Sequence, residues 1–177
     1  MPHIPLPEPV PGIRGLMSFK PVSGDKLMEL AQQLLCADSS LTRGERELIA
    51  SYVSARNQCR YCYGLHSWAA AFVLDVGHDH VEHIVHDPEH APIDERMRAL
   101  LRIAAKVRTD ARSVSAEDVA AARAAGADDE AVHDTVLIAA AFCMYNRYVD
   151  GLAAIVPEDP EVYERNARRV ATKGYLR

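Results

Sequence analysis

The sequence has no apolar run long enough to cross a bilayer. The longest run, from Val136 to Met144, is far shorter than the roughly 20 residues that a membrane-spanning helix needs. The opening stretch, MPHIPLPEPVPGIRG, is rich in proline and lacks the apolar segment of a secretory signal. We therefore expect a cytoplasmic protein with no membrane partner.

An excess of basic charge is also missing. The 20 lysines and arginines are outnumbered by 25 acidic residues, and the formal net charge is −5 at pH 7. Nucleic-acid binding needs clusters of lysine and arginine that neutralise phosphates, and the chain has no basic run of that kind. We therefore expect no nucleic-acid partner.

Cysteine is too scarce for a fold stapled by disulfides. The 177 residues include four cysteines, of which Cys59 and Cys62 form a Cys-x-x-Cys pair. In a reducing compartment such a pair is typical of a catalytic or metal-binding site. The remaining two, Cys36 and Cys143, lie in apolar helical stretches and are expected to be packing residues.

Strict alternation of apolar and polar residues is absent, so the predicted fold class is all-α. The length suits a single domain with its own core. We expect an extended N-terminal arm over residues 1–21, lying across a neighbouring subunit, and one helical domain over residues 22–177. Periodicity and capping residues predict helices that begin near residues 25, 43, 59, 93, 129 and 161.

Two expectations concern helix ends. The helix that begins at Cys59 is predicted to run to about Leu74, with Gly77 as the residue that closes it, because glycine readily adopts the left-handed conformation that ends a helix. The residues after Thr172 are predicted to form a frayed tail.

The cysteine pair lies among residues that suit proton transfer. If a helix begins at about Cys59, then Cys59, Cys62 and His66 share one face of its first two turns. A cysteine at the start of a helix is more acidic than a free one, and the thiolate is its reactive form. Imidazole titrates near neutrality, so His66 can take or return a proton. Glu47 lies on the preceding helix, and a hairpin of the two helices would bring its carboxylate to the pair.

The residues Glu47, Cys59-Arg60-Tyr61-Cys62 and His66 together resemble the signature of the alkylhydroperoxidase D (AhpD) proteins in the carboxymuconolactone decarboxylase-like superfamily. The stretches LTRGERELIA and MYNRYVDGLAAIV are similar to the peroxidase-related branch, so the likeness runs from about Pro11 to Val156. The resemblance implies an AhpD-like helical fold and a thiol-dependent peroxidase. It also implies a homo-oligomer, either a dimer or a trimer of dimers.

The same resemblance implies roles for the site residues. Cys62 would be the thiol that attacks the peroxide, Cys59 the thiol that resolves it, and Glu47 with His66 the proton relay. No cofactor or metal is implied beyond an external dithiol reductant. In AhpD a histidine often precedes the second cysteine, where this chain has Tyr61.

Other interpretations remain open at this stage. Cys59, Cys62 and His66 could be zinc ligands, with Glu47 or a histidine from residues 78–90 as the fourth. Those histidines could form a metal site of their own or a solvated polar helix; they are His78, His80, His83, His86 and His90. The superfamily's decarboxylase or lactone chemistry is a poor match, since relatives that perform it lack the cysteine pair. A redox-sensing or scaffold oligomer is the non-enzymatic alternative.

Overall fold

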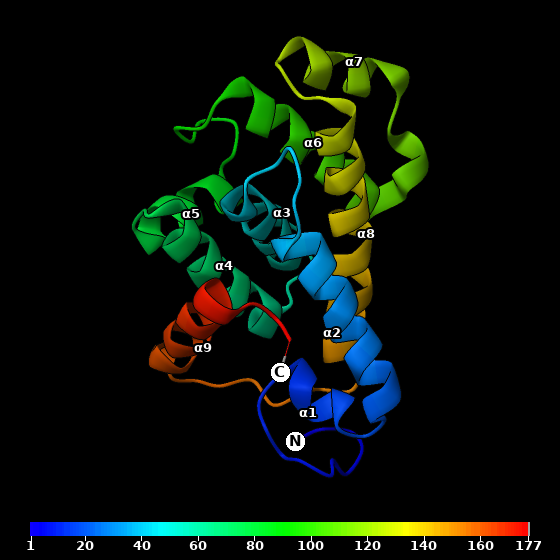
Figure 1. Cartoon of the computed structure of the whole chain (residues 1–177), viewed down its shortest axis with the longest axis vertical. Helices are drawn as coiled ribbons and strands as arrows, with labels where there is room; N and C mark the ends of the chain where they lie inside the picture. Colours follow the sequence, from blue (N-terminus) through cyan, green and yellow to red (C-terminus); the bar gives the residue numbers. More distant parts are fainter. Residues whose placement is uncertain (177) are drawn as a thin grey trace.

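Helices account for all the regular structure in the computed structural model, which describes residues 1–176. The predicted all-α class is confirmed, because no strand occurs among these residues. In chain order the elements are α1 (Ile13–Met17), α2 (Pro21–Cys36), α3 (Arg43–Arg56), α4 (Arg60–Leu74), α5 (His78–His86), α6 (Glu95–Asp110), a 3-10 turn (Ala111–Ser113), α7 (Ala116–Ala124), α8 (Asp129–Gly151) and α9 (Pro160–Lys173) (Figure 1).

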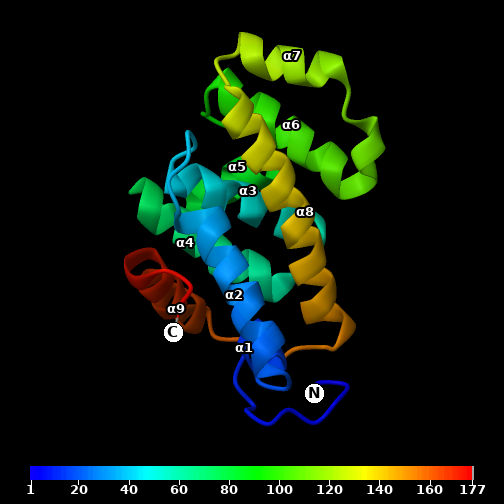
Figure 2. The ribbon, with the colours of Figure 1, turned by 45° about the vertical axis from the view of Figure 1, so that its right-hand side comes forward.

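The longest helix, α8, runs along the length of the molecule beside α2 (Figures 1 and 2). Helix α3 packs against both α8 and α4, and α9 packs on α4. The centre of α8 is buried as its apolar sequence predicts, with Ile138, Ala139 and Phe142 almost wholly covered. None of the helices in residues 1–176 combines the length and the apolar character needed to span a membrane.

Helix α3, which carries Glu47, begins at a capping box. The Thr42 hydroxyl accepts a hydrogen bond from the backbone N–H of Glu45, and the Glu45 carboxylate accepts one from the backbone N–H of Thr42. Two of the unpaired N–H groups at this helix end are thereby satisfied. Arg96 of α6 also pairs with Glu45, so the same carboxylate joins two helices.

The N-terminal arm differs from the extended segment that the sequence predicts. It contains the short helix α1, and α2 begins at Pro21 rather than near Asp25, because proline suits the first position of a helix. The arm is held by its own chain: the backbone N–H groups of His3 and Gly12 donate to the carbonyls of Leu152 and Ile155, at 3.0 and 2.8 Å. Contact with a neighbouring subunit stays a prediction.

Gly12 shows why the arm takes this path. Its φ of 70° lies in the region that favours glycine, and a Cβ atom there would overlap the ring of Tyr61. The arm can therefore lie directly on the start of α4.

Two predictions about the residues that follow helices are wrong. Helix α4 ends at Leu74, where the sequence predicts its end, but Asp75 adopts the left-handed conformation (φ 55°) that we assigned to Gly77. Aspartate tolerates this conformation better than most side chains. The residues after α9 do not fray over the part that the structure describes: Gly174 turns the chain with a φ of 75°, and Tyr175 is buried.

Replacement of Thr42 by alanine should lower the free energy of unfolding by about 1 kcal/mol, since the variant loses the cap of α3. Urea denaturation measures this change. Thr172→Ala is the matched control, because that hydroxyl bonds only to carbonyls of its own helix, and its effect should stay within about 0.5 kcal/mol. Equal effects of the two substitutions would contradict the role assigned to the cap.

Candidate active site

The turn between α3 and α4 places the cysteine pair at the start of α4. Gln58 has a φ of 61°, unusual for a residue other than glycine, and the chain reverses there. The backbone N–H of Cys59 donates to the Ser54 carbonyl at 3.0 Å, and Cys59 becomes the N-cap of α4. Cys62 lies in the first turn, where unpaired N–H groups and the positive end of the helix favour negative charge.

The two sulfur atoms have different surroundings. Cys59 is fully buried and does not line the cavity described below, whereas Cys62 does. A hydrogen bond with Cys62, together with burial, raises the pKa of the Cys59 thiol. Cys59 is thus held as the neutral thiol that donates toward Cys62, so a negative charge on the pair is most stable on Cys62, beside the cavity.

The carboxylate of Glu47 reaches across the α3–α4 hairpin to His66. The Glu47 Oε2 atom lies 2.8 Å from Nδ1 of His66, and both side chains are buried. An edge-to-face contact with Phe142 also holds the imidazole in place. The two ring centroids are 4.7 Å apart, and the angle between the ring planes is 88°. Because the carboxylate faces Nδ1, the neutral imidazole favours a proton on Nδ1 and leaves Nε2 as its acceptor.

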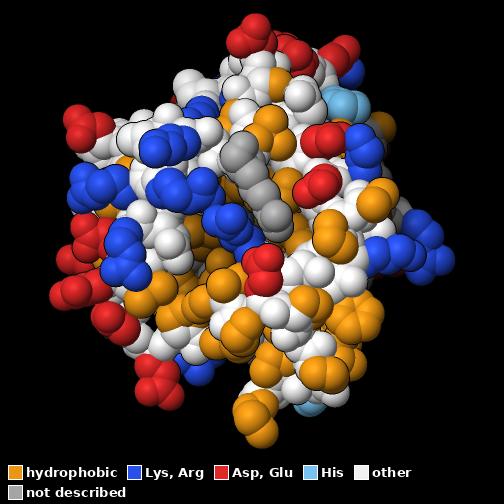
Figure 3. Space-filling view, turned by 60° about the horizontal axis from the view of Figure 1, so that its bottom comes forward, with side chains coloured by type: hydrophobic (Ala, Val, Ile, Leu, Met, Phe, Trp, Pro, Cys, Tyr) orange, Lys and Arg blue, Asp and Glu red, His pale blue; other side chains and the backbone are white. Residues whose placement is uncertain are grey.

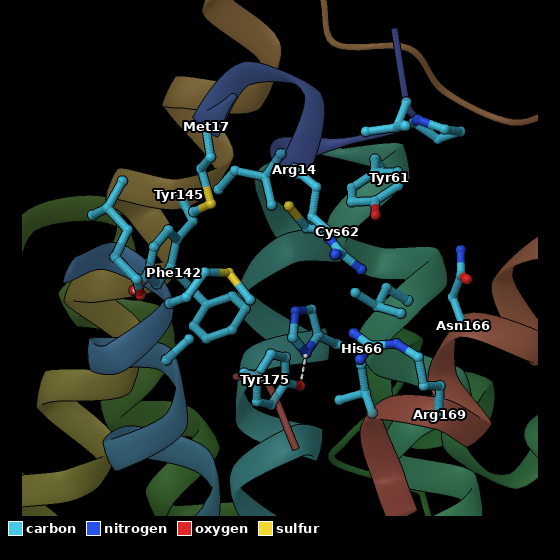
Figure 4. A pocket seen from close by; sticks show the side chains of 18 of the residues that line it. Arg14, Met17, Tyr61, Cys62, His66, Phe142, Tyr145, Asn166, Arg169 and Tyr175 are labelled. Carbon is cyan, nitrogen blue, oxygen red and sulfur yellow. Dashed lines mark hydrogen bonds between the residues drawn. The ribbon is translucent and has the colours of Figure 1, made fainter. Parts of the chain in front are cut away.

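Tyr175 joins this pair and was not predicted from the sequence. Its hydroxyl donates to Glu47 Oε1 at 2.6 Å and lies 3.2 Å from Nδ1 of His66 (Figure 4). The backbone N–H of Tyr175 donates to the side-chain carbonyl of Gln32, which fixes the tail on α2. Burial and the neighbouring Glu47 carboxylate raise the pKa of Tyr175 well above its ordinary value, so the phenol stays a donor. An aromatic residue directly after Gly174 was the only available signal.

Tyr61, at the position where AhpD often has histidine, lies beside the cysteine pair. Its ring is buried between Gly12 of the arm and Tyr163 of α9, with the two tyrosine ring centroids 6.0 Å apart. It lines the same cavity as Cys62. Tyr61 therefore contributes a wall of the cavity and connects the two ends of the chain around it.

The cavity has a volume of about 300 Å³, and both Cys62 and His66 line it. Figure 4 shows the surrounding side chains, which come from the arm, α1, α2, α4, α8, α9 and the C-terminal segment. The lining is mostly apolar, with Arg14, Asn166 and Arg169 among its polar members. A small organic molecule that entered it would meet a thiol and an imidazole together.

The geometry does not favour zinc at the cysteine pair. Among residues 1–176, Cys59, Cys62, His66 and Glu47 are not a set of donor atoms that converges closely enough to bind a metal ion. Glu47 is instead engaged by His66 and Tyr175. The one convergent group in the described chain is His78, Asp79 and Glu82, whose donor atoms lie within 4.8 Å of one another.

The histidine-rich segment has a structural role on the outer side of α4. The ring of His78 stacks on Trp68, with centroids 4.1 Å apart, and lies 2.9 Å from the Ser67 hydroxyl. Burial lowers the pKa of His78, which favours its neutral form. His83 and His90 are exposed, so the interpretation as a partly solvated helix fits this segment better than a shared site of five histidines.

Replacement of Tyr175 by phenylalanine should lower the free energy of unfolding at pH 7 by about 1–3 kcal/mol, because a buried carboxylate loses a donor. The raised pKa of Tyr175 means that the folded state binds the phenol proton more tightly than the unfolded state does. The stabilisation from this difference is complete below about pH 10 and is lost as the pH rises further. The free energy of unfolding should therefore decline less steeply above pH 10 in the variant than in the wild type.

Urea denaturation between pH 7 and 11 tests both effects. Tyr148→Phe is the matched control, since the Tyr148 side chain is only partly buried and makes no side-chain hydrogen bond within residues 1–176. A Tyr175→Phe variant as stable as this control would contradict the described network.

Solved structures of other proteins share this fold. An uncharacterized peroxidase-related protein from Silicibacter sp. TM1040 is 27% identical, with a TM-score of 0.79 over 90% of this chain and 81% of that one. An uncharacterized peroxidase-related protein from Ralstonia eutropha JMP134, described as an alkylhydroperoxidase AhpD core, is 24% identical, with a TM-score of 0.83 over 94% and 96%. A protein of unknown function from Agrobacterium tumefaciens, provisionally assigned to AhpD antioxidant defence, is 19% identical, with a TM-score of 0.71 over 81% and 97%.

Sequence comparison points the same way. Residues 21–73 match the model of the carboxymuconolactone decarboxylase family, and this segment contains Glu47, Cys59, Cys62 and His66. No curated protein matches the chain. The chain thus matches the carboxymuconolactone decarboxylase family model over residues 21–73 and has the AhpD-like fold of its peroxidase-related structural neighbours.

Proposed function

We propose that the protein is a thiol-dependent peroxidase that reduces hydroperoxides through the Cys59–Cys62 couple. One observation carries the proposal: a buried Glu47–His66 pair lies beside a cavity into which Cys62 opens. An antioxidant role is consistent with the peroxidase-related structural neighbours. The specific chemistry and the roles below are inferred from the site.

The first step transfers oxygen to sulfur. The Cys62 thiolate attacks the distal oxygen of the hydroperoxide, an S–O bond forms and the O–O bond breaks. The sulfur becomes a sulfenic acid, and the leaving alkoxide takes a proton to become the alcohol. His66 is the proton donor and acceptor in this scheme, because it lines the cavity and its other nitrogen faces Glu47.

The second step closes the disulfide. The Cys59 sulfur attacks the sulfenic sulfur of Cys62, water leaves and an S–S bond forms. An external dithiol then returns two electrons and two protons by thiol–disulfide exchange. The buried neutral thiol at Cys59 suits the resolving role, since it is kept away from the peroxide and next to Cys62.

We also propose that the protein works as a homo-oligomer. Large apolar side chains are exposed on α2 and α8, where Val22 is 76% and Met144 43% accessible in the single chain. A self-association surface would cover such side chains. The reductant remains defined only by its chemistry, as a dithiol.

Replacement of Cys62 by serine should abolish peroxide consumption, whereas Cys59→Ser should allow one turnover and leave a sulfenic acid or mixed disulfide on Cys62. Intact-mass spectrometry with a sulfenic-acid trap measures this difference. The wild-type protein should lose two hydrogens between Cys59 and Cys62 after peroxide treatment. Cys36→Ser and Cys143→Ser are the controls and should behave as wild type. Loss of activity in both site variants without any adduct would argue against these roles.

Replacement of Glu47 by glutamine should lower kcat/KM by about tenfold to a hundredfold and move its rise with pH toward higher pH, because His66 without its carboxylate partner assists deprotonation of the Cys62 thiol less well. Stopped-flow peroxide reduction between pH 5 and 9 provides the profile. Glu45→Gln at the cap of α3 is the control, since it removes a carboxylate from the same helix outside the site. An unchanged pH profile in Glu47→Gln would remove the carboxylate from the mechanism.

A further inference from the structure

Two cationic side chains from opposite ends of the chain line the cavity beside Cys62. Arg14 of α1 and Arg169 of α9 both line it, and in Figure 4 both side chains extend inward, from above and from the right. Burial raises the pKa of Tyr61 to about 12, and the positive charges of Arg14 and Arg169 both act against that rise. The two guanidinium groups therefore approach the same part of the cavity, near the Tyr61 ring.

No protein carboxylate in residues 1–176 forms an ion pair with either arginine. Some other arginines of the described chain pair with carboxylates, as Arg96 does with Glu45, and others donate to backbone carbonyls, as Arg43 does to Val170 and Ala171. Glu8 also lines the cavity, but it lies beyond ion-pair distance of both guanidinium groups. Tyr61 stays neutral at pH 7 because its pKa is about 12, so it supplies no negative charge.

The rest of the lining suits a hydrocarbon. Leu27, Met28, Leu65 and Phe142 line the cavity together with Cys62. On the face that carries the two chain ends, Figure 3 shows lysine and arginine side chains next to a broad group of hydrophobic ones. The volume of about 300 Å³ is at the small end of the range for ligand sites. The cavity thus fits a short molecule with an apolar body and one anionic group.

We propose that the cavity binds a small amphipathic carboxylate and that the preferred peroxidase substrate is an organic hydroperoxide carrying such a carboxylate. The inference rests on the proposed function and specifies its substrate class. The carboxylate accepts hydrogen bonds from Arg14 and Arg169, whose planar groups match it, and Asn166 adds an amide one turn before Arg169. The hydrocarbon lies on the apolar wall, and the hydroperoxide end meets Cys62.

Binding of an unreactive probe tests the carboxylate site without any peroxide chemistry. Isothermal titration with 4-phenylbutyrate should give a measurable affinity, and 4-phenylbutanol, which has the same body without the charge, should bind more weakly. Arg14→Met and Arg169→Met should each weaken the affinity for 4-phenylbutyrate by about tenfold, since each removes a charge-assisted hydrogen bond. The affinity for 4-phenylbutanol should stay unchanged in both variants. Arg165→Met is the matched control, because Arg165 is exposed on the same helix as Arg169 and does not line the cavity.

Glu8→Gln should have the opposite effect. It removes the one carboxylate among residues 1–176 that lines the cavity, so 4-phenylbutyrate should bind more tightly than to the wild type. Equal affinity for the acid and the alcohol, or equal affinity in the Arg169→Met and Arg165→Met variants, would overturn the carboxylate site.

Kinetics with a matched pair of substrates then separate the two proposals. Cumene hydroperoxide and its 4-carboxylated derivative differ by one carboxylate, and the derivative should have a KM about tenfold lower in the wild type but not in Arg169→Met. Turnover of both hydroperoxides without this preference would overturn the substrate class and leave the peroxidase proposal intact. Arginine-dependent binding of 4-phenylbutyrate with no turnover of either hydroperoxide would overturn the peroxidase and preserve the carboxylate site.

Discussion

A carboxylate with no exposed surface is the constraint around which this structure is arranged. Glu47 is fully buried, and an unpaired charge in such a place would cost several kcal/mol. His66 from α4 and Tyr175 from the C-terminal segment surround its two oxygens. The α3–α4 hairpin and the tail after α9 must therefore meet at one point, and that point lies beside the cysteine pair. The burial of Glu47 and the proposed chemistry of the site both require that these segments meet.

The asymmetry of the two thiols follows from their places in the turn. Cys59 closes the turn as the N-cap of α4 and faces a small apolar cluster that includes Leu16 and Val149. Cys62, one turn further, opens to the cavity. A low-dielectric surrounding disfavours charge on the first sulfur, and the helix end favours charge on the second. One Cys-x-x-Cys sequence thus provides a fully buried thiol and a thiol that lines the cavity.

Both ends of the chain complete the cavity. The arm contributes Arg14 and the backbone of Gly12, while α9 and the tail contribute Arg169 and Tyr175. The family match over residues 21–73 covers the thiols and the relay but leaves both of these end segments outside it. The cysteine pair thus lies in the segment that matches the family model, whereas Arg14, Arg169 and Tyr175 lie in the flanking segments of this chain.

The helical class, the start of α4 and the convergence of Glu47 with His66 could be predicted from the sequence, because they depend on local spacing and one short hairpin. The residue that turns the chain after α4 could not, since Asp75 and Gly77 both tolerate a turn and packing decided between them. Tyr175, Arg14 and Arg169 carried no periodic or motif signal. Their positions arise from contacts between segments more than 100 residues apart, such as Tyr175 with Glu47. Local sequence determined which groups can react. Only long-range packing decided which groups surround them, because side chains from distant segments become neighbours only in the folded chain.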